Sequence, residues 1–133
     1  MAFTNGCFDV LHAGHVQYLQ EARAQADLLV VGLNSDASVQ GLKGKARPLQ
    51  PLPARATVLA GLQAVDFVTP FDDATPLALI RAIHPDVLVK GADYRKDEVV
   101  GAEFVESYGG QVHLATLHHG HSTSRLIEQM RAA

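Results

Sequence analysis

The 133-residue sequence has few of the residues that define several classes of protein. Its one cysteine, Cys7, cannot form an internal disulfide, which excludes a disulfide-built secreted scaffold. It has no tryptophan, no apolar run near the roughly 20 residues of a membrane span, and no signal-peptide pattern before its first motif. We therefore expect a cytoplasmic protein that does not act at a membrane.

Basic residues are also scarce, because 11 Lys and Arg stand against 14 Asp and Glu for a net charge of −3. This balance gives no general electrostatic footprint for nucleic acid, but a local basic site for a small phosphorylated ligand stays open. The phosphate loop Gly-x-x-x-x-Gly-Lys-Ser/Thr is absent, which excludes a P-loop nucleotide hydrolase. With 47% apolar residues, the chain is able to bury a core, and its length suits one domain over residues 1–133.

Short apolar runs alternate with helical patterns from end to end. Strands are predicted at residues 2–5, 28–33, 67–69, 87–89 and 112–117. Helices are predicted at residues 14–26, 53–65, 75–83, 99–108 and 122–130. The alternation indicates an α/β fold: a Rossmann-like, doubly wound, five-stranded parallel sheet in a single domain.

Two finer predictions concern the middle of the chain. In the helix at residues 53–65, an apolar stripe of four residues is expected to be buried: Val58, Leu59, Leu62 and Val65. Residues 41–53 form the longest irregular stretch, and Lys43, Lys45 and Arg47 make it a candidate mobile basic loop.

Parallel sheets of this kind bind ligands at the carboxyl ends of their strands. Chemistry is therefore expected after Asn5, Leu33, Val89 and Leu117, and unusual residues follow each of them.

The most informative segment is residues 6–15, GCFDVLHAGH, between the first strand and the first helix. Gly6 permits a tight turn whose backbone N–H groups face an anion, and Gly14 leaves room for a nucleotide. His12 and His15 are three residues apart at a helix start, so both side chains reach the same place. Taken alone, such a pair is more typical of surface histidines near a helix cap, but with Phe8 and Asp9 at this spacing the segment indicates function.

Residues 4–15, TNGCFDVLHAGH, resemble the nucleotidyltransferase superfamily with the His-x-Gly-His signature, and most closely its heptose 1-phosphate adenylyltransferase branch. The resemblance continues through residues 34–39, 42–44, 47–48 and 89–94 and ends at residues 122–124, so it covers nearly the whole chain. In many bacteria this domain is the C-terminal half of a bifunctional ADP-heptose synthase, joined to a sugar kinase.

The resemblance implies transfer of an adenylyl group from ATP to D-glycero-D-manno-heptose 1-phosphate, giving ADP-heptose and pyrophosphate for the lipopolysaccharide core. It also implies Mg²⁺ that arrives with ATP, held through phosphates and water rather than by a dedicated protein site. Members of the family commonly form homodimers. Catalysis of this kind is mainly positioning and charge stabilisation, so no activated nucleophile is required.

The resemblance also implies a set of site residues. The catalytic group is His12, His15 and Lys43. The nucleotide-binding group is Gly6, Cys7, Phe8, Gly14, Gly91, Asp93, Ser122, Thr123 and Ser124. The group that contacts the substrate phosphate is Asp9 and Arg55.

Several of these residues have a structural alternative. Lys43 is also typical of a solvated loop lysine, and Arg55 of an exposed helix arginine. Residues 90–94 also suit a plain turn, and Ser122 a helix N-cap. For Asp36, helix capping is the favoured role.

The sequence departs from the family pattern before its last motif. Many relatives have an arginine shortly before the Ser-Thr run, whereas this chain has His118, His119 and His121. A structural zinc site would require four placed ligands, so no metal site is expected from these histidines, and no redox role is expected for Cys7.

Two other functions stay open. One is a cytidylyltransferase acting on glycerol 3-phosphate or a related alcohol phosphate, because the His-x-Gly-His core does not reveal the base. The other is a nucleotide-binding module without turnover.

Overall fold

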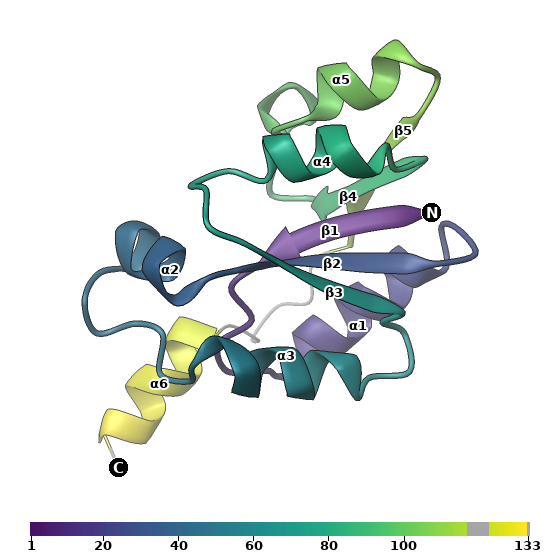
Figure 1. The fold of residues 1–133 in the computed structure, drawn as a ribbon. Helices are drawn as coiled ribbons and strands as arrows, with labels where there is room; N and C mark the ends of the chain where they lie inside the picture. Colours follow the sequence, from purple (N-terminus) through teal and green to yellow (C-terminus); the bar gives the residue numbers. More distant parts are fainter. Residues whose placement is uncertain (117–122, 133) are drawn as a thin grey trace.

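All five predicted strands are present in the computed structural model, which describes residues 1–116 and 123–132. They are β1 (Ala2–Gly6), β2 (Leu29–Asn34), β3 (Phe67–Phe71), β4 (Val87–Gly91) and β5 (Gln111–Ala115). Every pairing is parallel and the strand order is β3-β2-β1-β4-β5 (Figure 1). The predicted α/β fold with a five-stranded parallel sheet is therefore confirmed.

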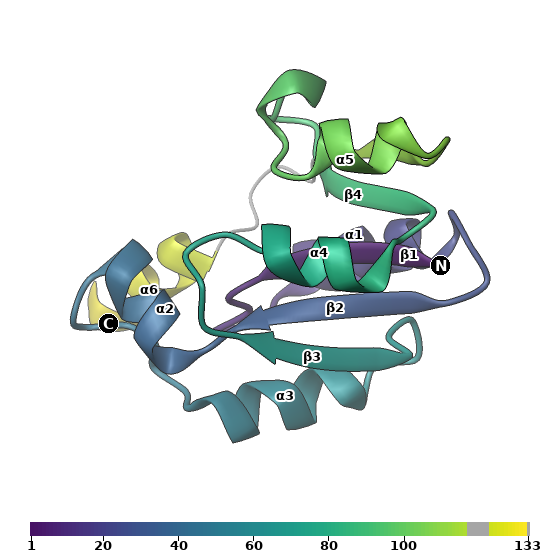
Figure 2. The same ribbon diagram turned by 45° about the horizontal axis from the view of Figure 1, so that its top comes forward.

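Helices cover both faces of this sheet. One face carries α1 (Ala13–Arg23) and α3 (Leu52–Ala60), and the other carries α4 (Leu77–Ile83) and α5 (Ala102–Ser107) (Figures 1 and 2). The helices α2 (Asp36–Lys43) and α6 (Thr123–Ala132) lie at the end of the sheet toward which the strands point. The sheet is thus doubly wound, as predicted.

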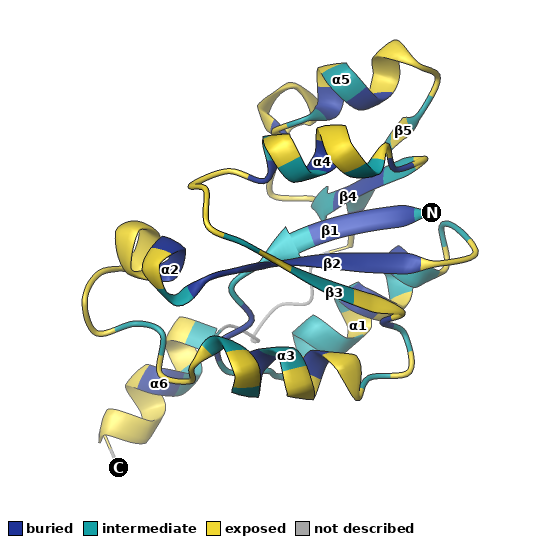
Figure 3. Ribbon diagram, in the orientation of Figure 1, coloured by how far each residue is buried: buried dark blue, intermediate teal, exposed yellow. Residues whose placement is uncertain are grey.

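Alternate residues of the strands supply two separate cores. Leu29, Val31 and Leu33 of β2 pack on the α1 and α3 side, together with Leu19 and Leu59 from those helices. On the other side, Phe3, Val30 and Leu88 pack against Ile80 and Val105 from α4 and α5. Because both faces are covered, every residue of β2 is buried, which explains its continuous apolar run (Figure 3).

The pairing of β1 with β4 stops early, and this opens the sheet. β1 pairs with β2 over all five of its residues, but with β4 only at Ala2–Val87 and Phe3–Leu88. Beyond that point the two strands separate, and the strand order reverses between them. A crevice at such a switch point is the usual ligand site of a doubly wound sheet.

Where β1 and β4 separate, side chains supply hydrogen bonds to a backbone carbonyl of β4 in place of the neighbouring strand. The carbonyl oxygen of Val89 accepts from the Thr4 hydroxyl at 3.0 Å and lies 3.1 Å from the Tyr18 phenol, which is itself 2.7 Å from Thr4 Oγ1. Burial raises the pKa of Tyr18 to about 12, so its phenol stays protonated at neutral pH.

The middle of the chain differs from the sequence-based prediction. The helix α3 ends at Ala60 rather than at residue 65, so Leu62 and Val65 lie in the turn after it, and Val58 is 46% exposed. Residues 41–43 are helical, because α2 extends to Lys43 before Gly44, with φ of 95°, ends it. The N-cap of α2 is Ser35, whose Oγ accepts from the Ser38 N–H, so the capping role predicted for Asp36 belongs to its neighbour.

Other element ends differ by a few residues: a 3-10 turn forms at Lys96–Glu98, and the helix predicted at residues 99–108 spans only Ala102–Ser107, because Gly101 before it has a left-handed conformation with φ of 88°. Within the described residues, no helix has the length and apolar character needed to cross a membrane.

Candidate active site

A cavity of about 490 Å³ lies at the carboxyl ends of β1, β2 and β4. Its volume is within the range of small-molecule sites. Among the described residues, eight predicted site residues line it: Gly6, Cys7, Phe8, Asp9, His15, Lys43, Gly91 and Thr123. The cavity therefore gathers segments that are more than 100 residues apart in the sequence.

The turn after β1 is shaped by Phe8. Phe8 has a positive φ of 45°, which is uncommon for an aromatic residue, and its ring is buried in the core. A Cβ on Gly6 would lie 2.8 Å from Cε2 of that ring. Gly6 is thus required in this turn because the Phe8 ring folds back over it and leaves no room for a side chain.

His12 and His15 come together at the start of α1, as their spacing predicts. His12 is the residue before the helix, and its backbone N–H donates to Nδ1 of His15 at 3.3 Å. The two rings stack with centroids 3.9 Å apart, and the Phe8 ring meets His15 edge-on at 5.4 Å. Since Nδ1 of His15 is an acceptor, the proton of the neutral ring resides on Nε2.

The surroundings keep His15 neutral. Burial and the adjacent His12 together lower the pKa of His15 to about 4. At neutral pH, His15 therefore offers the cavity an N–H donor without a positive charge. His12 and Gly14 stand at the same helix start but do not line the cavity.

Lys43 is the last residue of α2, and it lines the cavity. Lys43 is exposed, and the helix ends at Gly44 directly after it. It lies on a helix instead of the mobile loop that we expected.

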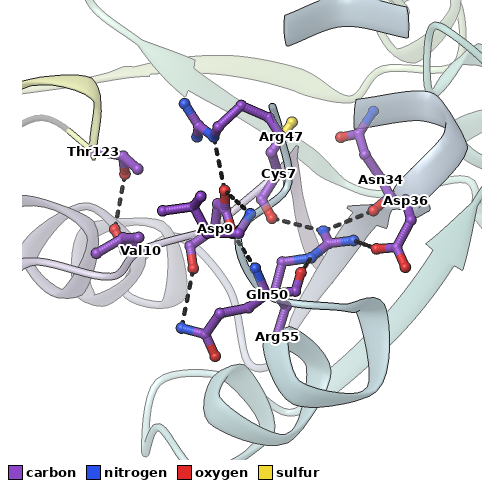
Figure 4. Close-up of polar contacts among 10 residues, drawn as sticks. Cys7, Asp9, Val10, Asn34, Asp36, Arg47, Gln50, Arg55 and Thr123 are labelled. Atoms are coloured by element: carbon purple, nitrogen blue, oxygen red, sulfur yellow. Dashed lines mark hydrogen bonds and ion pairs between the residues drawn. The ribbon is translucent and has the colours of Figure 1, made fainter. Parts of the chain in front are cut away.

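The structure directs the Asp9 carboxylate at protein donors, whereas we expected it at the substrate phosphate. The Asp9 side chain is fully buried and accepts from Nε of Arg47 at 2.7 Å and from the backbone N–H groups of Leu49 at 2.8 Å and Gln50 at 2.9 Å (Figure 4). Burial raises the pKa of Asp9, but these hydrogen bonds outweigh it and hold the pKa below the usual value. An ionised carboxylate repels a phosphate, so Asp9 supports the segment 47–50 and does not itself suit a phosphate.

Arg55 is also placed differently from our prediction. It is only 1% exposed and does not line the cavity. Its guanidinium donates to the carbonyl oxygens of Gln50, Cys7 and Asn34 at 2.8–2.9 Å and to the Asp36 carboxylate at 2.6 Å (Figure 4). Arg55 thus joins the ends of β1 and β2 from behind the cavity, and its donors are directed at protein atoms rather than at a substrate phosphate.

The opposite wall holds residues that the sequence analysis missed. Lys90, at the end of β4, has its ammonium 5.3 Å from the centre of the Tyr94 ring, and both residues line the cavity. Burial lowers the pKa of Lys90, partly offset by the charge of Asp93. A charged residue at the end of an apolar parallel strand is the signal that identifies Lys90 in the sequence. Asp93, which we expected at the nucleotide, is exposed and outside the lining.

Of the Ser-Thr-Ser motif at residues 122–124, the structure describes Thr123 and Ser124. Thr123 Oγ1 donates to the carbonyl oxygen of Val10 at 2.8 Å, which ties the start of α6 to the turn after β1 (Figure 4). Ser124 is exposed and does not line the cavity. Ser122, His118, His119 and His121 lie outside the described residues.

The chemistry of the cavity suits a phosphorylated ligand. Three cations, Lys43, Arg47 and Lys90, line it together with the N–H donor of His15. Within residues 1–116 and 123–132, no group of three or more His, Cys, Asp or Glu side chains is placed to hold a metal ion. A divalent cation would fit this site as a companion of the ligand's phosphates, which need few protein ligands.

Comparisons with known proteins give relatives over nearly the whole chain. The chain is 60% identical to the bifunctional protein HldE of Acidiphilium cryptum and 61% identical to that of Caulobacter sp. K31, in each case over 132 residues that make up 99% of this chain and 27% of the relative. The chain thus spans about a quarter of the length of these curated relatives.

Solved structures share the fold. The lipopolysaccharide core biosynthesis protein of Thermoplasma volcanium superposes with a TM-score of 0.67 at 26% identity, over 87% of this chain and 93% of that one. A pantothenate synthetase from Thermus thermophilus, at 18% identity, has a TM-score of 0.54 over 86% of this chain and 54% of that one, which indicates a shared fold only. The cytidylyltransferase-like family model matches residues 3–129. This chain, with stacked histidines at the switch point of its sheet, belongs to the cytidylyltransferase-like family.

Proposed function

We propose that the chain transfers the adenylyl group of ATP to D-glycero-D-manno-heptose 1-phosphate and releases pyrophosphate. The observation that carries this proposal is the His12–His15 pair at the start of α1, beside a cavity whose wall includes three cations. Similarity to HldE proteins and to a lipopolysaccharide core biosynthesis protein supports the heptose substrate. The cytoplasmic location and a homodimer are part of the same proposal.

The reaction is an in-line displacement at the α-phosphorus. A phosphate oxygen of the sugar phosphate forms the new bond to this phosphorus, the bond from the α-phosphorus to the bridging oxygen breaks, and pyrophosphate leaves with the electron pair. Mg²⁺ bound to the triphosphate would neutralise charge on the leaving group. No covalent intermediate with the protein is required.

The residues of the chain contribute position and charge. His15 is suited to donate from Nε2 to a phosphate oxygen, because the His12 N–H occupies its Nδ1. Lys43 supplies a positive charge from the end of α2, and Lys90 supplies another from the opposite wall. The positive end of the α1 helix dipole also favours an anion.

The test is pyrophosphate release by the 133-residue chain with ATP or CTP and with heptose 1-phosphate or glycerol 3-phosphate. The proposal predicts release with ATP and heptose 1-phosphate. His15→Ala should lower kcat by about 10²- to 10³-fold, the usual effect of removing a donor to developing charge.

His84→Asn is the matched control, because His84 is exposed at the end of α4, outside the cavity lining, and its left-handed conformation (φ 55°) suits asparagine. This variant should retain full activity. Release with CTP and glycerol 3-phosphate alone would instead identify a cytidylyltransferase. Binding of ATP without release in any combination would identify a module without turnover.

A further inference from the structure

The segment between α2 and α3 is fastened to the protein at one buried carboxylate. Asp9 accepts from three donors of this segment: the Arg47 side chain and the backbone N–H groups of Leu49 and Gln50. The Asp9 side chain is fully buried, so its negative charge has no exposure to solvent. A buried carboxylate with a charged donor and two backbone donors holds those donors in one geometry.

This arrangement leaves most of the Arg47 guanidinium available. Only Nε of Arg47 bonds to Asp9, and among the described residues neither terminal nitrogen has a hydrogen-bond partner. Arg47 lines the cavity although its side chain is only 12% exposed. In Figure 4 its terminal nitrogens extend away from Asp9.

The terminal nitrogens of Arg47 are not among the buried polar atoms that lack a partner, so they reach the cavity and can donate to a ligand there. A cavity that binds phosphorylated substrates supplies one, since the guanidinium matches two phosphate oxygens with two parallel N–H donors. Fixing Nε at Asp9 also lowers the entropy that the side chain loses when a phosphate binds.

We propose that Arg47 is a phosphate-binding residue of this cavity and that Asp9 is the residue that positions it. The inference rests on the proposed function, in which both substrates carry phosphate groups. It also gives Asp9 a role that its surroundings permit, because the carboxylate acts through the arginine and does not meet the phosphate. The phosphate belongs either to the nucleotide or to the sugar, and the experiment separates these two sources.

The experiment measures binding and turnover with Arg47→Gln, and with Lys45→Gln as the matched control. Lys45 lies in the same segment, is exposed and does not line the cavity. Calorimetry with Mg-ATP, heptose 1-phosphate and inorganic pyrophosphate gives the affinity for each phosphate source. Loss of a hydrogen bond to a charged group corresponds to about a 10- to 100-fold loss of affinity.

We expect Arg47→Gln to weaken binding of at least one of these ligands by that factor, and Lys45→Gln to change each by less than about threefold. A loss confined to heptose 1-phosphate, with a raised KM for the sugar, assigns Arg47 to the acceptor phosphate. A loss with Mg-ATP and pyrophosphate assigns it to the triphosphate. Unchanged affinity for all three in Arg47→Gln overturns the proposal, as does a wild-type chain that binds none of them.

The positioning role of Asp9 is tested by a double-mutant cycle. Asp9→Asn should weaken the same ligand as Arg47→Gln in the wild-type background, and have little further effect on its affinity in the Arg47→Gln background. Equal effects in both backgrounds would show that Asp9 acts on the fold and not through Arg47, which overturns its part of the proposal.

These tests remain informative if the proposed reaction is absent. A chain that releases no pyrophosphate but binds it through Arg47 contradicts the proposed function and supports this inference. A chain that turns over normally with Arg47→Gln, with unchanged affinities, supports the function and contradicts the inference.

Discussion

Arg55 connects four segments of the chain through one guanidinium. Its partners lie in the segment before α3, the turn after β1, the end of β2 and the first residue of α2. Two of the accepting carbonyls, at Cys7 and Asn34, belong to residues that line the cavity. The shape of that end of the cavity therefore depends on a residue that does not face it.

Replacing this residue should destabilise the whole fold. Arg55→Met leaves the carbonyl groups of Cys7 and Asn34 without their donor, and each buried unsatisfied group costs about 1–3 kcal/mol. We expect the free energy of unfolding to fall by at least about 3 kcal/mol, measured by urea denaturation. Arg95→Ala, at a side chain that is 76% exposed, should change it by less than about 0.5 kcal/mol. Equal stability of Arg55→Met and wild type would contradict the structural role.

The low pKa of His15 predicts how stability depends on pH. An unfolded histidine has a pKa near 6.5, whereas that of folded His15 is about 4. Between these values the unfolded chain binds more protons, so the free energy of unfolding should decrease as the pH falls from about 6.5 to about 4. The contribution of one proton is at most about 1.4 kcal/mol per pH unit.

Urea midpoints of wild type and His15→Gln, compared between pH 7 and pH 4, measure this effect. The wild-type stability should fall more steeply than that of the variant. Parallel curves would show that His15 is not held neutral by the fold.

At the scale of single elements, a glycine can be required by close packing in one element and be unfavourable for the backbone in another. Gly32 lies within β2, and a Cβ there would lie 2.8 Å from Cζ of Phe3 and 3.3 Å from Cβ of Asn5. Gly41 lies within α2, and a Cβ there would meet nothing within 4 Å. The same substitution should therefore have opposite effects in the two elements.

Gly32→Ala should destabilise the protein by about 1–3 kcal/mol, because the Phe3 ring is fully buried and must shift against the α4 and α5 core. Gly41→Ala should stabilise it by about 0.5–1 kcal/mol, because alanine loses less backbone entropy than glycine in a helix. Thermal unfolding of both variants gives the comparison. A gain in stability for Gly32→Ala would mean that the crossing of Phe3 over β2 is looser than the structure indicates.

At the scale of the whole molecule, the cavity draws on segments from both halves of the chain. Cys7 and Asp9 come from the start, Lys43 from the middle, Lys90 from β4 and Thr123 from α6. A ligand that contacts all of these walls binds the folded chain and not the unfolded one. Ligand binding should thus stabilise the fold as a whole.

We expect Mg-ATP at 100 times its dissociation constant to raise the free energy of unfolding by about 2.7 kcal/mol. Chelating the metal with EDTA should reduce this gain, because the triphosphate then enters with its full negative charge. Mg²⁺ without nucleotide should give no gain, since the described residues include no cluster of three metal-binding side chains. Stabilisation by Mg²⁺ alone, measured by scanning calorimetry, would indicate a metal site of the protein itself.

Much of the fold follows from local sequence pattern. The continuous apolar run before Asn34 predicts a buried strand because both faces of a parallel sheet are covered, and this is what β2 shows. The three-residue spacing of His12 and His15 likewise predicts that their rings meet, and they do so because His12 caps the helix in which His15 is the third residue. The order of the strands in the sheet came only from the structure, because local pattern does not specify which strands pair.

The roles of Asp9, Arg47, Arg55 and Lys90 depended on tertiary structure. An arginine in a helical pattern is exposed or buried according to which carbonyls surround it, and those around Arg55 come from residues up to 48 positions away. Asp9 and Arg47, 38 residues apart, pair because α2 returns the chain to the turn after β1. The sequence alone determined roughly where the strands and helices end, because local periodicity indicates this, and therefore which residue types stand at those ends. Which of these side chains meet a ligand, and which hold the backbone behind it, was decided by long-range packing, because charge and hydrogen-bond partners are set by neighbours in space.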